Sequence, residues 1–266
     1  MTTTASDSLA SEPQYQALRK WNLGLGALHF VQALVMLIIS LGINANLPIQ
    51  TSFLSYTGTG FTPVTEVVVN IPIGAAVSAF LFLSALAHFT MASPWVYPWY
   101  AKKLSEKINY IRWFEYSLSS SWMLVIIAML CGIYDLGTLV LIFGSCAVMN
   151  LCGLLMEMRN QGREKVDWTP FWVGCVAGIL PWIAIILYFL GALLNSTGDV
   201  PTFLYFIIIS LFVSFNVFPI IMVLQYTKKG KFQDYLYGER GYMIMSLVAK
   251  TLLAWQVWSG TLRPLM

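Results

Sequence analysis

Seven apolar segments of about 20 residues constrain this chain more than any other feature of its sequence. A helix of about 20 apolar residues crosses a hydrocarbon core about 30 Å thick. Charged residues make up only 10% of the 266 residues, too few to cover a water-soluble protein of this size. We therefore expect an all-α, multi-pass protein of the cell membrane, with seven transmembrane helices in one domain (21–262) after a polar N-terminal segment (1–20). The predicted spans are 21–43, 72–92, 107–130, 137–157, 169–191, 201–226 and 240–262.

Lysine and arginine are confined to alternate loops, and this distribution predicts the orientation of the chain. The loops 44–71, 131–136 and 192–200 contain no basic residue. The other loops are basic, and they contain Arg19, Lys20, Lys102, Lys103, Lys107, Arg159, Arg163, Lys165, Lys228, Lys229, Lys231 and Arg240. Because cytoplasmic loops are enriched in Lys and Arg, the pattern predicts a cytoplasmic N-terminus and an external C-terminus.

The external loop 44–71 is the longest connection in the chain. Gly58 and Gly60 supply turn residues, and the β-branched segment 64–69 follows them. This pattern favours a small β-hairpin on the outer face between the first two helices. An irregular surface loop is the alternative.

Two ionisable residues, Glu115 and Lys250, lie deep within predicted spans. At about 1.5 Å rise per residue, they lie roughly 13 and 15 Å from the cytoplasmic ends of spans three and seven, so the two charges share a level. We therefore expect an ion pair. A buried structural salt bridge is one interpretation. The other is that Lys250 forms a Schiff base with a carbonyl ligand, which desolvated lysines commonly do.

Other polar residues fall near the same level. Ser246 lies one turn before Lys250 on the same helix face, where its hydroxyl could bond the ion pair or its own helix backbone. The two histidines, His29 and His88, lie in the cytoplasmic halves of spans one and two, with the shallower Arg112 in span three. They favour a polar inner cavity that can accept protons, although histidines that only pack between helices are the alternative.

Aromatic residues are 15% of the chain, and several lie within spans. Some are expected at the membrane interfaces. Those that face inward would form apolar walls around a long conjugated ligand. The candidates are Trp113, Tyr116, Trp172, Trp182, Phe215 and Phe218.

Two sequence strings connect these features to a family. Residues 112–122 read RWFEYSLSSSW, and residues 246–251 read SLVAKT. With seven spans and an internal N-terminus, they resemble the heliorhodopsins, a family of retinal-binding proteins. The resemblance covers essentially all of the chain after residue 20.

The resemblance implies roles for particular residues. Lys250 would carry all-trans retinal as a protonated Schiff base, with Glu115 as its counterion. Ser246 would stand where ion-pumping rhodopsins usually have a second carboxylate. His29 and His88 would line the cytoplasmic-side cavity that accepts the proton, and Arg112 would belong to the same cavity. The remaining pocket residues would be Trp113, Tyr116, Ser119, Trp172, Phe215 and Phe218, and the external hairpin would contribute to a homodimer surface.

The same comparison bears on ion transport. Ile126 occupies the position, three turns after Glu115, where outward proton pumps carry a second carboxylate. We therefore expect a light sensor that signals to an unknown cytoplasmic partner without pumping ions. A light-driven or light-gated proton or ion conductor is the first alternative, and a non-photochemical transporter or receptor is the second.

Other functional classes find no support in the sequence. No metal cluster, nucleophile–base pair or phosphate loop appears, and the four cysteines lie in or beside apolar runs. We expect neither an enzyme nor a nucleic-acid-binding protein. The expected partners are membrane lipid, a second copy of the chain and the signalling partner.

Overall fold

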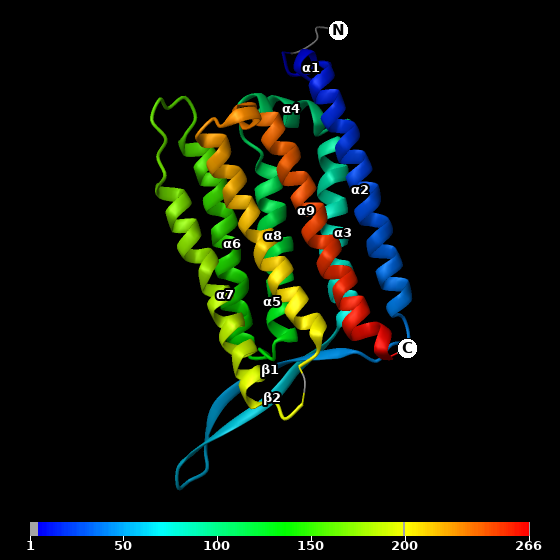
Figure 1. The fold of residues 1–266 in the computed structure, drawn as a ribbon, viewed down its shortest axis with the longest axis vertical. Helices are drawn as coiled ribbons and strands as arrows, with labels where there is room; N and C mark the ends of the chain where they lie inside the picture. The colour runs from blue at the N-terminus through cyan, green and yellow to red at the C-terminus, as the bar shows by residue number, and fades with distance from the viewer. Residues whose placement is uncertain (1–4, 199, 266) are drawn as a thin grey trace.

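The structure is a computed structural model that describes residues 5–198 and 200–265. The described residues form seven long helices arranged as a bundle (Figure 1). Neighbours in the bundle include α2 and α3, α3 and α5, α5 and α6, α6 and α7, and α8 and α9. The long helices are α2 (Pro13–Ser40), α3 (Ile73–Ala92), α5 (Tyr110–Leu130), α6 (Leu136–Arg159), α7 (Thr169–Asn195), α8 (Thr202–Tyr226) and α9 (Tyr235–Val257).

Six of these helices, α2, α3 and α5 to α8, are long and apolar enough to cross a membrane. The helix α9 has 23 residues, a comparable length, but it contains Glu239, Arg240 and Lys250. Short elements complete the described chain: α1 (Ala5–Ala10), α4 (Tyr97–Ser105), single turns at Gly230–Gln233 and Arg263–Leu265, and a π-helical turn at Trp258–Leu262 that continues α9.

The first long helix begins earlier than the sequence pattern predicted. It starts at Pro13, which suits the first helical turn because proline has no N–H to leave unpaired there. Tyr15 and Leu18 are buried in a cluster that includes Tyr97 and Tyr100 of α4. The helix α2 therefore extends eight residues before the predicted span 21–43, and Tyr15 and Leu18 of this extension pack with residues of α4.

The connection between α2 and α3 is a β-hairpin, as the turn and β-branched residues predicted. The strands β1 (Asn46–Tyr56) and β2 (Phe61–Pro72) pair antiparallel, with an irregularity between Ile49 and Gln50. The hairpin projects from one end of the bundle (Figure 1). Its base is attached there, because Ile49 is buried and the Gln50 N–H donates to the Tyr134 carbonyl over 2.8 Å.

Several helix starts are capped by side chains that the sequence supplies. Asn109 accepts from the Arg112 N–H at the start of α5, and Asp234 accepts from the Leu236 N–H at the start of α9. Asp135 accepts from the Thr138 N–H at the start of α6, and these hydrogen bonds from Thr138 lower the pKa of Asp135.

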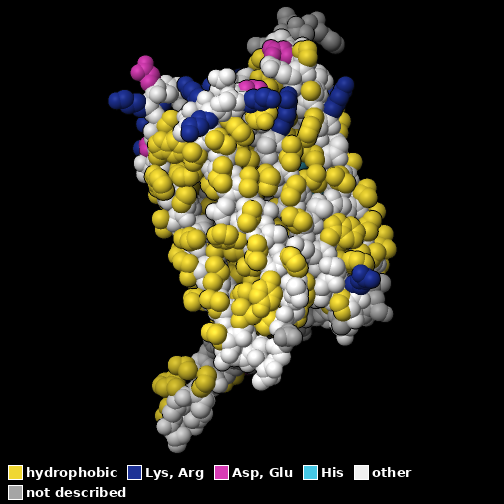
Figure 2. Space-filling view, in the orientation of Figure 1, with side chains coloured by type: hydrophobic (Ala, Val, Ile, Leu, Met, Phe, Trp, Pro, Cys, Tyr) yellow, Lys and Arg dark blue, Asp and Glu magenta, His cyan; other side chains and the backbone are white. Residues whose placement is uncertain are grey.

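The two ends of the bundle differ in charge. Lysine and arginine side chains gather at the end that carries α4, whereas apolar side chains cover the middle of the molecule (Figure 2). The hairpin lies at the opposite end (Figure 1).

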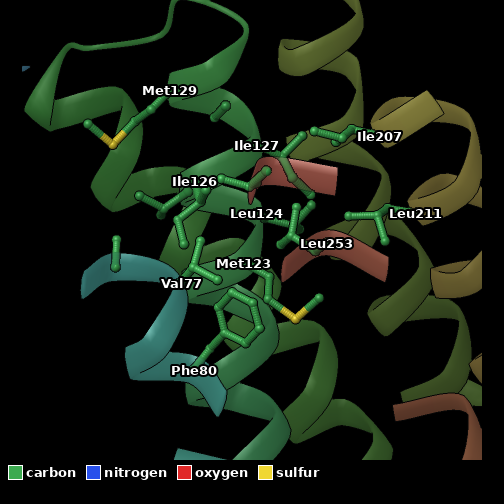
Figure 3. Packing of buried hydrophobic residues seen from close by; sticks show 14 of the residues in the cluster. Val77, Phe80, Met123, Leu124, Ile126, Ile127, Met129, Ile207, Leu211 and Leu253 are labelled. Atoms are coloured by element: carbon green, nitrogen blue, oxygen red, sulfur yellow. The ribbon is translucent and has the colours of Figure 1, made fainter. Parts of the chain in front are cut away.

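A large apolar cluster fills much of the bundle interior. It includes Val77 and Phe80 of α3, Leu124, Ile126 and Ile127 of α5, and Leu253 of α9 (Figure 3). The cluster also contains Ile49 from the base of the hairpin, so it reaches the hairpin end. These buried apolar side chains fill the space between α3, α5 and α9.

Candidate functional site

The structure brings Lys250 and Glu115 together as an ion pair. Lys250 Nζ of α9 donates to Glu115 Oε1 of α5 over 3.0 Å, although 135 residues separate them. Lys250 is only 3% exposed, so its amine does not extend to the membrane surface. Nζ also lies 5.1 Å from the centre of the Tyr116 ring, where a cation is favoured.

Two serines form hydrogen bonds with this pair. Lys250 Nζ donates to Ser246 Oγ over 2.7 Å, one of the two interactions that the sequence left open for this serine. Ser84 Oγ of α3 donates to Glu115 Oε1 over 2.6 Å. The sequence analysis missed Ser84, because a serine in an apolar helix gives no signal until a neighbouring helix is placed against it.

Lys250 lines a cavity of about 410 Å³, within the range of about 300–1,000 Å³ typical of small-molecule sites. Helices α5, α6, α7, α8 and α9 all contribute to its wall. Most of the lining is aromatic or aliphatic, and Ser246 and the Lys250 amine are among its few polar groups. The cavity therefore combines one buried amine with mostly apolar walls.

Aromatic rings form much of this wall. Trp113 and Tyr116 from α5, Trp182 from α7, and Phe215 and Phe218 from α8 line the cavity, so five of the six predicted aromatic residues come together there. Trp182 contacts Phe215 edge-on, with the ring centres 5.7 Å apart. These edge-to-face contacts hold the rings in defined orientations.

Two predicted pocket residues lie elsewhere. Trp172 is 64% exposed and does not line the cavity, whereas its neighbour Phe171 does. Consecutive helical residues point about 100° apart, and the wall of α7 follows Phe171, Gly174, Gly178 and Trp182. Ser119 is fully buried and lies beside Glu115, but it is not among the residues that line the cavity, whereas Ser120 is. The sequence did not give the rotation of either helix.

Glycines open space at the wall. A Cβ at Gly178 would come within 2.4 Å of Met149 Sδ, and a Cβ at Gly174 would lie 3.0 Å from Cys152 Cβ. Both glycines line the cavity on α7, beside residues of α6. Their lack of side chains lets α6 and α7 approach closely where the cavity forms.

The two predicted histidines stack on each other outside this cavity. Their ring centres are 5.6 Å apart with an angle of 10° between the rings. His88 Nδ1 is hydrogen-bonded to Asn22 Oδ1 over 2.8 Å, and His29 is fully buried. Their role as proton acceptors stays a prediction.

Arg112 lies in a buried charge cluster that the sequence analysis did not find. Its guanidinium donates to Glu157 of α6 and to Glu239 of α9. It also stacks on Tyr242, with Cζ 4.1 Å from the ring centre. The two glutamates lie near helix ends, where a carboxylate usually meets water, so the sequence gave no sign of their burial. Arg112 therefore links α5, α6 and α9.

The described helices thus form a bundle with a buried lysine–carboxylate pair at an aromatic cavity. A model of the heliorhodopsin family, described as Heliorhodopsin, matches residues 18–262. The chain belongs to this family and is a multi-pass integral membrane protein. A search of curated proteins gives no match.

Proposed function

We propose that this heliorhodopsin is a light-sensing photoreceptor that binds all-trans retinal on Lys250, with Glu115 as counterion. The observation that carries the proposal is the position of the Lys250 amine, which lines an aromatic cavity and lies 3.0 Å from a buried carboxylate. The apolar polyene chain of retinal can pack against such walls, and its aldehyde group can form a Schiff base with the amine. When bound, retinal would absorb visible light and isomerise.

The proposed attachment uses the Lys250 amine and the Glu115 carboxylate. After giving one proton to Glu115, the neutral amine would add to the aldehyde carbon, a C=N bond would replace the C=O bond, and the carbonyl oxygen would leave as water with the two remaining amine hydrogens. The proton on Glu115 would then return to the nitrogen. A protonated nitrogen in this linkage keeps one positive charge, and the Glu115 carboxylate neutralises it. Without that carboxylate the buried cation would be costly.

The residues around the pair have separate tasks in this proposal. Ser84 and Ser246 orient the charged groups through their hydrogen bonds of 2.6 and 2.7 Å. Trp182, Phe215 and Tyr116 exclude water and hold the polyene in position. A rigid wall of this kind converts a change in ligand shape into strain on α7 and α8.

The same proposal assigns no ion pumping to the chain. Ile126 is buried in the apolar cluster, at the position on α5 where a pump would need a proton-donating carboxylate. The neighbouring Leu124, Val125 and Ile127 are also buried and apolar. A continuous proton route toward the hairpin end would need polar groups in this region.

We further propose a cytoplasmic N-terminus, an external C-terminus and a homodimer. The basic residues at the α4 end support this orientation, because cytoplasmic loops are enriched in Lys and Arg. Apolar side chains on the hairpin, including Leu54 and Phe61, are exposed and suit contact with a second copy. The cytoplasmic loops would then present the signal to a partner.

A visible spectrum tests the central proposal. The membrane-expressed protein is incubated with all-trans retinal, beside a Lys250→Ala variant whose folding is checked by its helical circular dichroism. We expect a band far to the red of free retinal in the wild type and none in the variant. No band in the folded wild type, or an equal band in the variant, would contradict the proposal.

A further inference from the structure

A second, much smaller cavity lies between the Lys250–Glu115 pair and the Arg112 cluster. Its volume is about 20 Å³, and about 10–15 Å³ on this measure is enough for one water molecule. Glu115 and Glu239 both line it, so the small cavity contacts the Lys250–Glu115 ion pair on one side and the Arg112 cluster on the other. The other polar lining residues are His88, Tyr100, Asn109, Arg112 and Tyr116.

Two buried donors at this cavity lack partners. Arg112 Nε and Tyr100 Oη make no hydrogen bond to any residue in the described part of the chain. Both residues are almost completely buried, at 3% and 2% exposure. Buried polar groups of this kind are nearly always bonded to protein or to ordered water. A water here would have two donors and the carboxylates of Glu115 and Glu239 as partners, which meets the two to four partners that a buried water needs.

The two carboxylates of the Arg112 cluster differ in their hydrogen bonds. Glu157 accepts from four donors, namely the Arg112 guanidinium, Tyr235 Oη, Trp113 Nε1 and the backbone N–H of Asn109. Glu239 accepts from Arg112 and from Asn109 Nδ2, fewer donors among the described residues than Glu157 has. A carboxylate offers about four acceptor positions. Glu157 is therefore saturated as an anion, while Glu239 retains acceptor capacity.

The cluster can take one additional proton. Two carboxylates, Glu157 and Glu239, face one guanidinium, Arg112, so the fully ionised group carries a net charge of −1. All three side chains are at most 4% exposed, and hydrogen bonds from Asn109, Trp113 and Tyr235 stabilise the ionised cluster before a proton arrives. A proton on Glu239 would leave a neutral cluster with the Arg112–Glu157 pair intact.

We propose that the small cavity binds one water molecule that links Glu115 to Glu239, and that Glu239 accepts the proton released from the Lys250 nitrogen in the light. This inference rests on the proposed photoreceptor function. The nitrogen gives its proton to Glu115 and keeps the electron pair of the N–H bond. Glu115 passes a proton to the water as the water gives one of its own to Glu239. The net result is one proton moved, with Glu115 again an anion and Glu239 a neutral acid.

The histidines are the competing acceptors. His88 also lines the small cavity, whereas His29 does not. His88 Nδ1 is already hydrogen-bonded to Asn22 Oδ1. A proton accepted by His88 would give no carboxylic-acid band in the infrared spectrum. The infrared test therefore distinguishes His88 from Glu239 as the acceptor.

Light-minus-dark infrared spectroscopy on the retinal-loaded protein tests the acceptor. We expect a carboxylic-acid C=O band to appear in the light in the wild type and to be lost in Glu239→Gln. This variant keeps one arginine opposite one glutamate, so the cluster stays paired. Glu66→Gln, on the exposed hairpin, is the matched control and keeps the band. Glu239→Asp restores the band at a shifted frequency.

The outcomes separate this inference from the proposed function. A visible retinal band with no light-induced carboxylic-acid band, or with that band kept in Glu239→Gln, overturns the inference alone. No visible band in the wild type overturns both. The water link is tested without retinal, in an experimental structure of Lys250→Ala that shows ordered waters. We expect a water within hydrogen-bond distance of Arg112 Nε, and its absence from a well-resolved map overturns the link.

Discussion

Gly153 of α6 lies directly against the indole ring of Trp113 on α5. A Cβ at position 153 would come within 2.3 Å of Trp113 Cζ3, so a side chain there requires the ring to move. Trp113 Nε1 donates to Glu157 over 2.7 Å, and the same ring lines the large cavity. The position of the Trp113 ring therefore depends on the packing of α5 against α6, and the same ring contacts both the large cavity and Glu157 of the charge cluster.

We expect Gly153→Ala to weaken both retinal binding and stability. Overpacking of a filled interior typically costs about 1–3 kcal/mol, and a displaced Trp113 would narrow the cavity. Thermal unfolding and the size of the visible band measure the two effects. Gly144→Ala, on the same helix with nothing within 4 Å of its Cβ, is the control and should change neither. Equal behaviour of the two variants would contradict the prediction.

Glu115 and Ser84 are expected to shift the colour in opposite directions. Glu115→Gln removes the negative charge beside Nζ and lessens the preference for positive charge there in the ground state, so the band moves to the red. Ser84→Ala removes a 2.6 Å hydrogen bond that spreads the charge of Glu115, so the band moves to the blue. Absorption spectra of the two variants decide the matter. An unchanged spectrum in Glu115→Gln would reject Glu115 as counterion.

The charged pair could be predicted from sequence because ionisable residues are rare within apolar spans. Glu115 and Lys250 also lie at similar distances from the cytoplasmic ends of their predicted spans, although in the structure α5 begins at Tyr110 and α9 at Tyr235, so the two residues are at different distances from their helix starts. Ser84, Glu157 and Glu239 could not be predicted in this way, since their environment is made by other helices. Glu157 and Glu239 lie near helix ends, where only tertiary packing decides between water and burial.

The rotation of a helix about its axis and the residue at which a helix starts also could not be predicted from the sequence. Trp172 and Phe171 have the same local pattern, and only the packing of α7 on α6 decides which one faces the cavity. The hairpin was predictable, because its turn glycines and β-branched residues act locally. The start of α2 at Pro13 was not, because residues 13–20 look polar until α4 covers Tyr15 and Leu18.

We expect no steady light-evoked current. The buried Leu124, Val125, Ile126 and Ile127 leave α5 without a proton-carrying group toward the hairpin end. Voltage clamp of cells that express the retinal-loaded protein measures the current, with a light-driven proton pump as the positive control. A current that reverses with the proton gradient would establish conduction instead.

The exposed hairpin residues are expected to control dimer formation. Leu54 is 66% exposed, and Leu54→Asp would place a charge in the proposed contact with a second copy. We expect a lower dimer fraction in cross-linking within lipid nanodiscs, with the visible band unchanged. Thr59→Asp, at the turn of the hairpin, is the control. A dimer fraction that Leu54→Asp leaves unchanged would place the interface elsewhere.

Asp135 is expected to give a pH-dependent contribution to stability. Its hydrogen bonds from Thr138 hold its pKa below the usual value, so the contribution is present above about pH 4 and is lost as the pH falls through the lowered pKa. Asp135→Ala should cost about 1 kcal/mol at neutral pH, as the loss of an N-cap does. Asp135→Asn keeps a capping oxygen, so its unfolding temperature should fall less in acid than that of the wild type. Parallel acid profiles for the wild type and Asp135→Asn would contradict this.

The aliphatic packing toward the hairpin end has an electrical consequence. A membrane voltage falls mainly across the least polarisable layer, and the cluster around Ile126 is such a layer. Moving one elementary charge through the whole field involves about 2.3 kcal/mol per 100 mV. A proton that moves between Glu115 and Glu239 stays on the polar side of that layer and crosses only a small part of the field. The light response should therefore proceed at nearly the same rate in polarised and depolarised membranes.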